Sequence, residues 1–193
     1  MQIFHSLTDD GLVKVLRNGG VGVLLTDTLY GLVARASDPH AVERLYALKH
    51  RERKPGTTIA ANADQLIELG LPEEMVAKAA PYWPAPLSVV MPLDKRLEYL
   101  HQGVGESPFR VVANEQLRVL LEQTGPLVTS SANQPGEPPA ENCAEAQGYF
   151  GASVDFYVDC GDVQNREPST IARVTQDGLE VLRQGAYHIN QEQ

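Results

Sequence analysis

Short apolar runs alternate along this chain with segments whose apolar residues recur at helical intervals, and this alternation constrains the fold most. Residues 21–25 have the pattern of a buried strand, and Val42, Leu45 and Leu48 then keep the spacing of one helix face. Such alternation is typical of α/β proteins. We therefore expect a single domain over residues 1–193, an α/β fold with an open, twisted, mixed β-sheet and helices packed on it.

Capping and turn signals place the other elements. Thr8 is expected to cap a first helix that stops at Gly19, and Asp38-Pro39 is a strong helix start, with an N-cap side chain before proline. Further strands are expected at residues 57–61, 87–91, 109–113, 127–130 and 154–158, and further helices after Asn114 and over residues 142–150. Residues 170–174 and 179–182 should form a hairpin through Asp177-Gly178, and residues 96–108 and 132–142 should be long loops.

Charge and cysteine content exclude several classes of protein. The formal net charge is −9, so binding of RNA through overall charge is excluded and any such contact needs a local basic patch. The two cysteines, Cys143 and Cys160, lack Cys-x-x-Cys spacing, which argues against a zinc ribbon and fits a reducing cytosol. No signal peptide is evident, and no apolar run approaches the roughly 18 residues of a membrane span. We expect a cytoplasmic protein with no membrane contact.

A run of positive charge stands where a helix should end. Residues 49–54 include the cations Lys49, Arg51, Arg53 and Lys54, just before a predicted loop. Such side chains can bind carboxylate or phosphate oxygens, and arginine can do so through two hydrogen bonds. Basic residues also favour helix C-termini and stay solvated there. Composition alone leaves both interpretations open.

Small polar residues follow two predicted strands. One group, residues 26–31, contains Thr28 and Tyr30, and the other, residues 129–133, contains Ser131 and Asn133. In open α/β sheets ligands bind outside the carboxyl ends of strands, where hydroxyls and amides could contact them. The same residue types also favour turns and caps, so a purely structural role is the alternative.

Two arginines, Arg110 and Arg183, lie in or beside strand-like apolar runs. Each needs an anion nearby because unpaired buried charge is costly, and either a ligand or a structural salt bridge would serve. Gly-Lys-Ser/Thr, His-Glu-x-x-His and Gly-x-Ser-x-Gly are all absent, and the histidines show no metal-ligand spacing. No protein-bound metal and no covalent nucleophile are expected.

Seven segments recur, in order, in a known family. They are residues 25–32 (LTDTLYGL), 49–51 (KHR), 83–88 (WPAPLS), 109–110 (FR), 131–136 (SANQPG), 168–171 (PSTI) and 182–185 (LRQG). Their order and spacing resemble the Sua5/YciO/YrdC family over about residues 8–187. The family patterns read Pro-Thr-Glu-Thr-x-Tyr-Gly-Leu, Lys-x-Arg, Trp-Pro-Gly-Pro-Leu-Thr, Val-Arg, Ser-Ala-Asn-x-Ser-Gly, Pro-Ser-Thr-Ile/Val and Leu-Arg-x-Gly. The resemblance implies a YrdC-like fold and the short form, without an extra C-terminal domain.

The resemblance implies a threonylcarbamoyl-AMP synthase, which joins L-threonine, bicarbonate and ATP and releases pyrophosphate. Mg²⁺ would enter with ATP, because magnesium usually binds through substrate phosphates. Downstream transfer proteins would pass the threonylcarbamoyl group to adenosine next to the tRNA anticodon. Contact with tRNA or double-stranded RNA is a further expectation.

Nine residues correspond to functional positions of the family. The catalytic pair is Lys49 and Arg51, the substrate-binding residues are Thr28, Tyr30, Arg110 and Ser131, and the nucleotide-binding residues are Asn133, Ser169 and Arg183. The substrate supplies the attacking oxygen, so the chemistry needs positive charge and positioning more than a nucleophilic side chain.

The chain departs from the family patterns at several positions. Leu25 and Asp27 replace proline and glutamate in the first motif, and Val112 replaces a proline after Arg110. These changes keep open a divergent paralogue that acts on another small molecule. A non-catalytic RNA-binding module is the other alternative, since family members present a basic concave surface.

Overall fold

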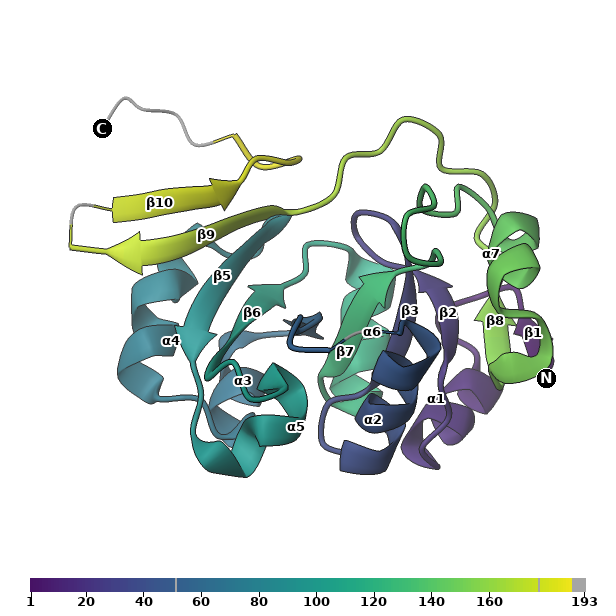
Figure 1. The fold of residues 1–193 in the computed structure, drawn as a ribbon, viewed down its shortest axis with the longest axis horizontal. Helices are drawn as coiled ribbons and strands as arrows, with labels where there is room; N and C mark the ends of the chain where they lie inside the picture. Colours follow the sequence, from purple (N-terminus) through teal and green to yellow (C-terminus); the bar gives the residue numbers. More distant parts are fainter. Residues whose placement is uncertain (51, 177, 189–193) are drawn as a thin grey trace.

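Ten strands form one mixed sheet within residues 1–50, 52–176 and 178–188, the part of the chain that the computed structural model describes (Figure 1). They are β1 (Gln2–Phe4), β2 (Gly22–Leu25), β3 (Tyr30–Arg35), β4 (Thr57–Ala60), β5 (Leu87–Pro92), β6 (Glu106–Val111), β7 (Leu127–Ser131), β8 (Phe156–Val158), β9 (Thr170–Thr175) and β10 (Gly178–Arg183). Their order is β1-β8-β2-β3-β7-β4-β6-β5-β9-β10, with parallel and antiparallel neighbours. The expected open mixed sheet is confirmed.

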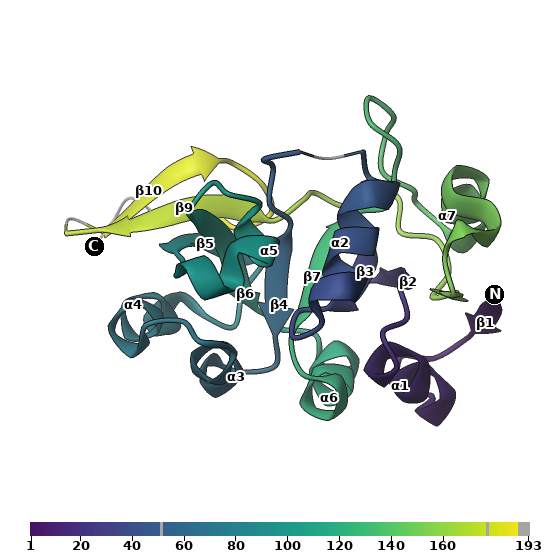
Figure 2. The ribbon, with the colours of Figure 1, turned by 60° about the horizontal axis from the view of Figure 1, so that its bottom comes forward.

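Helices cover both faces of this sheet (Figure 2). They are α1 (Asp10–Arg17), α2 (Pro39–Leu48), α3 (Ala63–Leu69), α4 (Glu73–Ala79), α5 (Glu98–His101), α6 (Glu115–Thr124) and α7 (Cys143–Phe150), with 3-10 turns at Ala80–Tyr82, Lys95–Leu97 and Gly151–Ser153. α1 and α6 lie side by side and share one apolar cluster, whereas α2 and α7 contribute to the other. No helix of the described residues is long and apolar enough to cross a bilayer.

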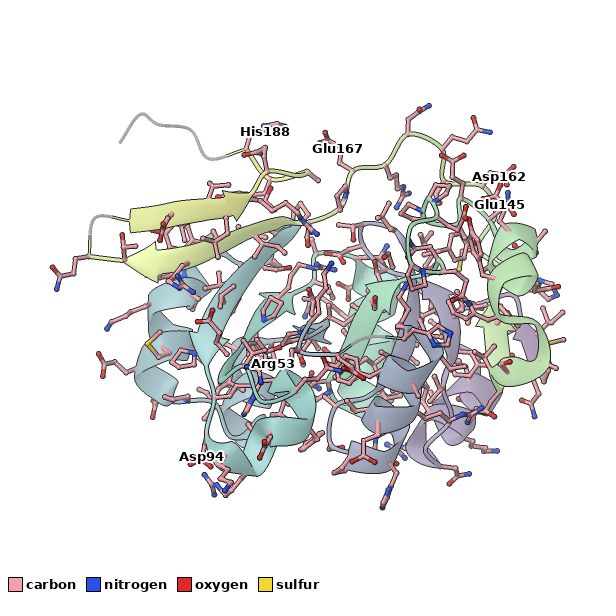
Figure 3. All side chains as sticks on the ribbon, viewed as in Figure 1. Arg53, Asp94, Glu145, Asp162, Glu167 and His188 are labelled. Atoms are coloured by element: carbon pink, nitrogen blue, oxygen red, sulfur yellow. The ribbon has the colours of Figure 1, made fainter. Side chains whose placement is uncertain are left out.

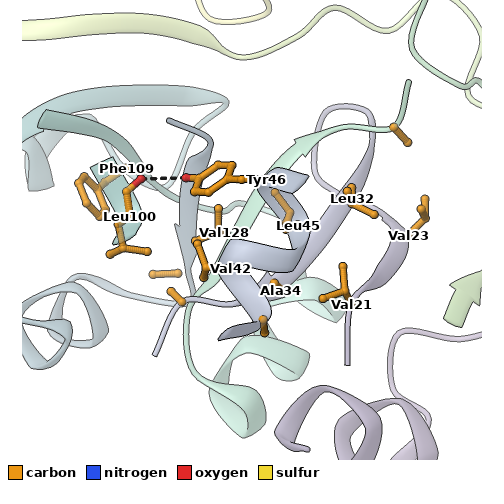
Figure 4. Packing of buried hydrophobic residues seen from close by; sticks show 14 of the residues in the cluster. Val21, Val23, Leu32, Ala34, Val42, Leu45, Tyr46, Leu100, Phe109 and Val128 are labelled. Carbon is orange, nitrogen blue, oxygen red and sulfur yellow. Dashed lines mark hydrogen bonds between the residues drawn. The ribbon is translucent and has the colours of Figure 1, made fainter. Parts of the chain in front are cut away.

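The strands contribute residues to both apolar clusters because successive side chains of a strand point to opposite faces of the sheet. Val23 belongs to the α2 cluster and Leu24 to the α1 cluster, and both are buried. On the α2 side, the Tyr46 hydroxyl donates to the Leu100 carbonyl at 2.8 Å (Figure 4) and accepts from the Gly56 amide at 3.1 Å. Tyr46 thereby ties the end of α2 to α5 and to the start of β4.

Most capping predictions are confirmed, and one is wrong. Asp38 accepts hydrogen bonds from two amides of α2, and Asn114 caps α6. Asn142, expected as the first residue of a helix, is instead the N-cap of α7. The first helix is capped by Asp9 and not by Thr8, since Asp9 Oδ1 accepts from the Gly11 amide at 2.7 Å. The C-terminal hairpin is confirmed as β9 and β10, although Asp177 of its turn lies outside the described residues.

The expected long loop at residues 96–108 is wrong. It contains α5 and the first half of β6. α5 has only four residues, too few to show a helical period, and Glu106 and Ser107 lack the apolar character of a strand. Residues 132–142 do lack helix and strand, as expected.

Strand register brings the polar segments to one edge of the sheet. Gly31 pairs with Ser131, and Thr57 pairs with Thr129, so the starts of β3 and β4 lie beside the C-terminal half of β7. The 26–29 turn, the 132–142 loop and the connection from β8 to β9 gather along the upper edge in Figure 1.

Candidate active site

A cavity of about 550 Å³ opens at this edge. Six predicted site residues line it: Thr28, Tyr30, Arg110, Ser131, Ser169 and Arg183. A neighbouring cavity of about 330 Å³ is lined by Lys49 and Asn133, and Lys54 lines both. Arg51, the ninth predicted residue, lies outside the described residues. The structure therefore brings eight predicted residues to two adjacent cavities.

The turn before β3 is held by Thr26. Its Oγ1 donates to the Leu29 carbonyl at 2.7 Å and accepts from the Thr28 and Leu29 amides at 3.2 Å. Threonine favours such turns because its hydroxyl replaces backbone partners. Thr28, two residues on, is buried and faces the cavity with its polar side chain.

Arg110 is buried in an ion pair. Its Nη2 donates to Asp27 Oδ1 at 2.6 Å, with side chains only 2% and 5% exposed, and its Nη1 donates to Ser88 Oγ at 3.1 Å. The anion partner that the sequence required is thus present as Asp27, and the ligand-binding role of Arg110 stays a prediction. Arg110 Nε and Asp27 Oδ2 have no hydrogen-bond partner among the described residues.

Lys49, the C-cap of α2, is buried rather than solvated, with an exposed fraction of 2%. Its ammonium donates to the Ser131 carbonyl at 2.7 Å, to Asn133 Oδ1 at 2.8 Å and to the Asn133 carbonyl. Ser131 Oγ also donates to Asn133 Oδ1, at 2.7 Å. The solvated interpretation of the basic run is therefore wrong for Lys49, which fixes the segment after β7.

The C-terminal segment closes the cavity on its other side. Arg183 Nη2 donates to the Ser169 carbonyl at 2.7 Å. Thr170 Oγ1 accepts from the Gly185 and Tyr187 amides at 3.0 and 3.1 Å and donates to the Tyr187 carbonyl at 2.7 Å. The Pro-Ser-Thr-Ile segment thus has two roles: Ser169 lines the cavity, and Thr170 anchors the segment that follows Arg183.

Tyr30 lines the cavity, but its hydroxyl is already bonded. It donates to the Gly161 carbonyl at 2.8 Å and accepts from the Cys160 amide at 3.0 Å. Burial raises the pKa of Tyr30 to about 12, so the phenol stays neutral. Tyr30 therefore holds the connection from β8 to β9, along which Figure 3 labels Asp162 and Glu167.

Sequence reasoning missed several residues of the cavity wall. Lys54 and Arg166 add positive charge to it, and Thr129 Oγ1 and Ser130 Oγ are buried without a partner among the described residues. Lys54 was visible in the basic run, and Thr129 and Ser130 in the polar group after β7. Arg166 stands in a loop with no pattern of its own.

The cavity wall is cationic although the protein is acidic. Among the described residues it contains Lys54, Arg110, Arg166 and Arg183 against the single carboxylate Glu141. Cations and hydroxyl donors in a concave site suit ligands with carboxylate or phosphate oxygens. The same residues contain no group of three or more His, Cys, Asp or Glu side chains that could hold a metal ion.

The fold and the site define an α/β protein with a mixed sheet and a cationic cavity at one edge. Residues 14–185 match the sequence model of the Sua5/YciO/YrdC family, described as Telomere recombination. The chain belongs to this family.

Relatives and solved structures agree with this membership. A Pseudomonas aeruginosa protein named threonylcarbamoyl-AMP synthase is 34% identical over 162 residues, 82% of this chain and 88% of that protein. The structure of P. abyssi Sua5 complexed with L-threonine matches with a TM-score of 0.82 and 26% identity, over 96% of this chain and 58% of that chain. E. coli YciO matches with a TM-score of 0.79 and 22% identity over 95% of each chain, which shows a shared fold.

Proposed function

We propose that this protein is a threonylcarbamoyl-AMP synthase, with residues 1–193 acting as one catalytic domain. The observation that carries the proposal is the cavity in which Arg110, Ser131 and Ser169 meet. Support comes from the P. aeruginosa relative of that name and from Sua5, which was solved with L-threonine. Both are proteins to which this chain is similar, and the activity described below is proposed for this chain.

The reaction joins three small substrates in two steps. The amine of L-threonine adds to bicarbonate with loss of water and forms an N-carboxylate. A carboxylate oxygen then attacks the α-phosphorus of ATP, and the bond to pyrophosphate breaks as the new oxygen–phosphorus bond forms. Negative charge accumulates on oxygens throughout, so preorganised cations and hydrogen-bond donors stabilise the transition state.

Apart from the role of Arg51, which lies outside the described residues, the proposed roles follow the walls of the two cavities. Thr28, Tyr30, Arg110 and Ser131 surround the amino acid and its carboxylate, Lys49 and Arg51 act on the phosphates, and Asn133, Ser169 and Arg183 bind the nucleotide. Lys54 and Arg166 are added because they place exposed cations on the cavity wall. Lys49 acts through its charge and by fixing the Ser131 and Asn133 carbonyls, since its ammonium already donates to both.

Mg²⁺ belongs to the nucleotide substrate in this proposal. Glu141 is the one carboxylate on the wall of the larger cavity within the described residues, and it is the residue that would help to hold the ion. This donor set fits magnesium, which keeps water and phosphate ligands and needs few from the protein.

The proposed partners are those of a soluble activating enzyme. Transfer proteins would take the product and modify adenosine next to the tRNA anticodon, and structured RNA would meet the protein only at its cationic edge. A cytoplasmic location fits the two cysteines, both free thiols.

Pyrophosphate release tests the proposal. ATP, Mg²⁺ and bicarbonate are supplied with each amino acid in turn, and release should require L-threonine and bicarbonate together. L-serine should be about 10- to 200-fold poorer, because it lacks one methyl group that an apolar contact detects. Equal turnover with serine, or release without any amino acid, would support the paralogue instead. Binding of structured RNA without any release would support the RNA-binding module.

A further inference from the structure

A chain of hydrogen bonds links the 26–29 turn to Ser169, the residue before β9, beside the larger cavity. Asp27 Oδ1 accepts from Arg110 Nη2 at 2.6 Å, and Arg110 Nη1 donates to Ser88 Oγ at 3.1 Å. Ser88 Oγ lies 3.0 Å from Ser169 Oγ. Val89 pairs with Phe109, so Ser88 and Arg110 stand next to that pair on neighbouring strands. Four segments distant in sequence are therefore connected through side chains alone.

The hydrogen-bonding capacity of these groups fixes the direction of the chain. A guanidinium has no acceptor, so Ser88 Oγ must accept from Arg110. Ser88 is fully buried, so its hydroxyl hydrogen needs an acceptor inside the protein. Among the described residues that Ser88 Oγ contacts, Ser169 Oγ is the one that can accept this hydrogen. A buried hydroxyl hydrogen without an acceptor is costly, so Ser88 donates to Ser169. Ser169 Oγ therefore accepts, and its own O–H remains available to donate.

Two donors then lack a protein acceptor among the described residues, and both belong to residues that line the cavity. Ser169 lines the cavity, and its Oγ is only an acceptor in the hydrogen bonds it makes, from Ser88 and, at 3.5 Å, from Arg183 Nη2. Arg110 Nε is buried and has no partner. Donors of this kind match the oxygens of a carboxylate or a phosphate.

We propose that Asp27 and Ser88 are positioning residues: together they fix the guanidinium of Arg110 and set Ser169 as a hydrogen-bond donor toward an anionic oxygen of the substrate. Asp27 also compensates the charge of Arg110, which would otherwise be buried and unpaired. Only the identity of that substrate rests on the proposed function. Ser88 is the last residue of the WPAPLS motif and Asp27 lies in the LTDTLYGL motif, so the inference gives both motifs a physical role.

The first test does not depend on turnover. NMR of isotope-labelled arginine reports rotation of each guanidinium, and the Arg110 signals are assigned by their loss in Arg110→Lys. Rotation should be slow in the wild type and faster in Asp27→Asn and Ser88→Ala, while Ser88→Thr, which keeps the hydroxyl, should stay slow. Unchanged rotation in both Asp27→Asn and Ser88→Ala would overturn the inference, even if the enzyme proves to have another substrate. Should Ser88→Ala not fold, Asp27→Asn decides alone.

The second test is a double-mutant cycle on pyrophosphate release. Ser88→Ala and Ser169→Ala should each lower kcat/KM for L-threonine by roughly 10- to 100-fold, as expected for losing a hydrogen bond to a charged group. Ser88→Ala added to Ser169→Ala should cost at least about 3-fold less than Ser88→Ala alone, because the part of its effect that passes through Ser169 is already lost. Losses that multiply fully would refute the coupling. Absence of release from the wild type would instead refute the proposed function, and the NMR result would stand.

Discussion

Lys49 differs from Arg53 and Lys54, two exposed cations of its run, because its charge is inside the protein. It is 2% exposed, and its ammonium holds the Ser131 carbonyl at 2.7 Å. Lys49→Ala should lower the rate of pyrophosphate release by about 30- to 1,000-fold, the effect of removing one preorganised charge-stabilising group. It should also lower the free energy of unfolding by about 1–3 kcal/mol, because buried acceptors lose their donor. Steady-state kinetics and denaturant unfolding measure the two effects.

Arg53 is the matched control for that substitution. It belongs to the same run, is exposed and lines neither cavity. Arg53→Ala should change stability by no more than about 0.5 kcal/mol and leave activity nearly intact. Equal loss of activity in Arg53→Ala and Lys49→Ala would mean that the basic run acts through its summed electrostatic field. The specific role of Lys49 would then be wrong.

Contacts of single residues also show what could not be predicted from the sequence. The need of Arg110 for an anion followed from its apolar surroundings, but Asp27 lies 83 positions away and Ser88 lies 22 positions away. No local pattern connects them, because the contact exists only after β5, β6 and the 26–29 turn meet. The burial of Lys49 was hidden for the same reason, since its acceptors lie 82 and 84 positions away.

Among the elements, β9 and β10 depend on close packing at Gly185. A Cβ added there would lie 2.1 Å from the Pro168 carbonyl oxygen, which is backbone and cannot rotate away. Gly185→Ala should therefore push the C-terminal segment off Ser169, with a stability loss of about 1–3 kcal/mol. The KM for ATP should rise in parallel, because Arg183 moves with the segment. Thermal unfolding and kinetics would show both effects.

Gly148→Ala provides the comparison within another element. Gly148 lies in α7, and nothing stands within 4 Å of its added Cβ. The change should stabilise the protein by up to about 1 kcal/mol, since alanine favours helices over glycine. Destabilisation by Gly148→Ala as large as that by Gly185→Ala would contradict the packing argument.

Element prediction succeeded where the local signal was strong. Asp38-Pro39 marked the start of α2, and the apolar runs marked β2, β5 and β7. β3 was missed because its first residues, Tyr30 and Gly31, read as the end of a polar turn. α3 and α4 were missed because each has only seven residues. Pairing order across the sheet could not be derived, since it is decided by contacts between distant segments.

For the molecule as a whole, two buried tyrosines should lower the stability at alkaline pH. Burial raises the pKa values of Tyr30 and Tyr157 from 10.0 to about 12. Above pH 10 the unfolded chain loses these protons while the folded chain keeps them, so stability falls as the pH rises from 10 to 12. Each tyrosine should contribute up to about 3 kcal/mol to this loss.

Denaturant unfolding at a series of pH values tests this dependence. Tyr30→Phe and Tyr157→Phe should each be less stable than the wild type at neutral pH, because Gly161 and Gly151 lose their hydroxyl partners. Between pH 10 and 12 each variant should lose stability less steeply than the wild type. An equal slope in all three proteins would show that other groups cause the alkaline loss.

The order of strands also governs how this protein can be made. β7 stands between β3 and β4, yet the ribosome completes β3 and β4 well before it reaches Leu127. β1 likewise cannot pair until β8, its parallel neighbour, has been made, and β8 begins at Phe156. Until then the emerging chain carries strand edges with unpaired backbone groups, the kind of surface that pairs with other chains. A translational pause before Leu127 would therefore hold the protein in an aggregation-prone form, whereas a pause late enough for Val158 to have left the ribosome would find the centre of the sheet closed.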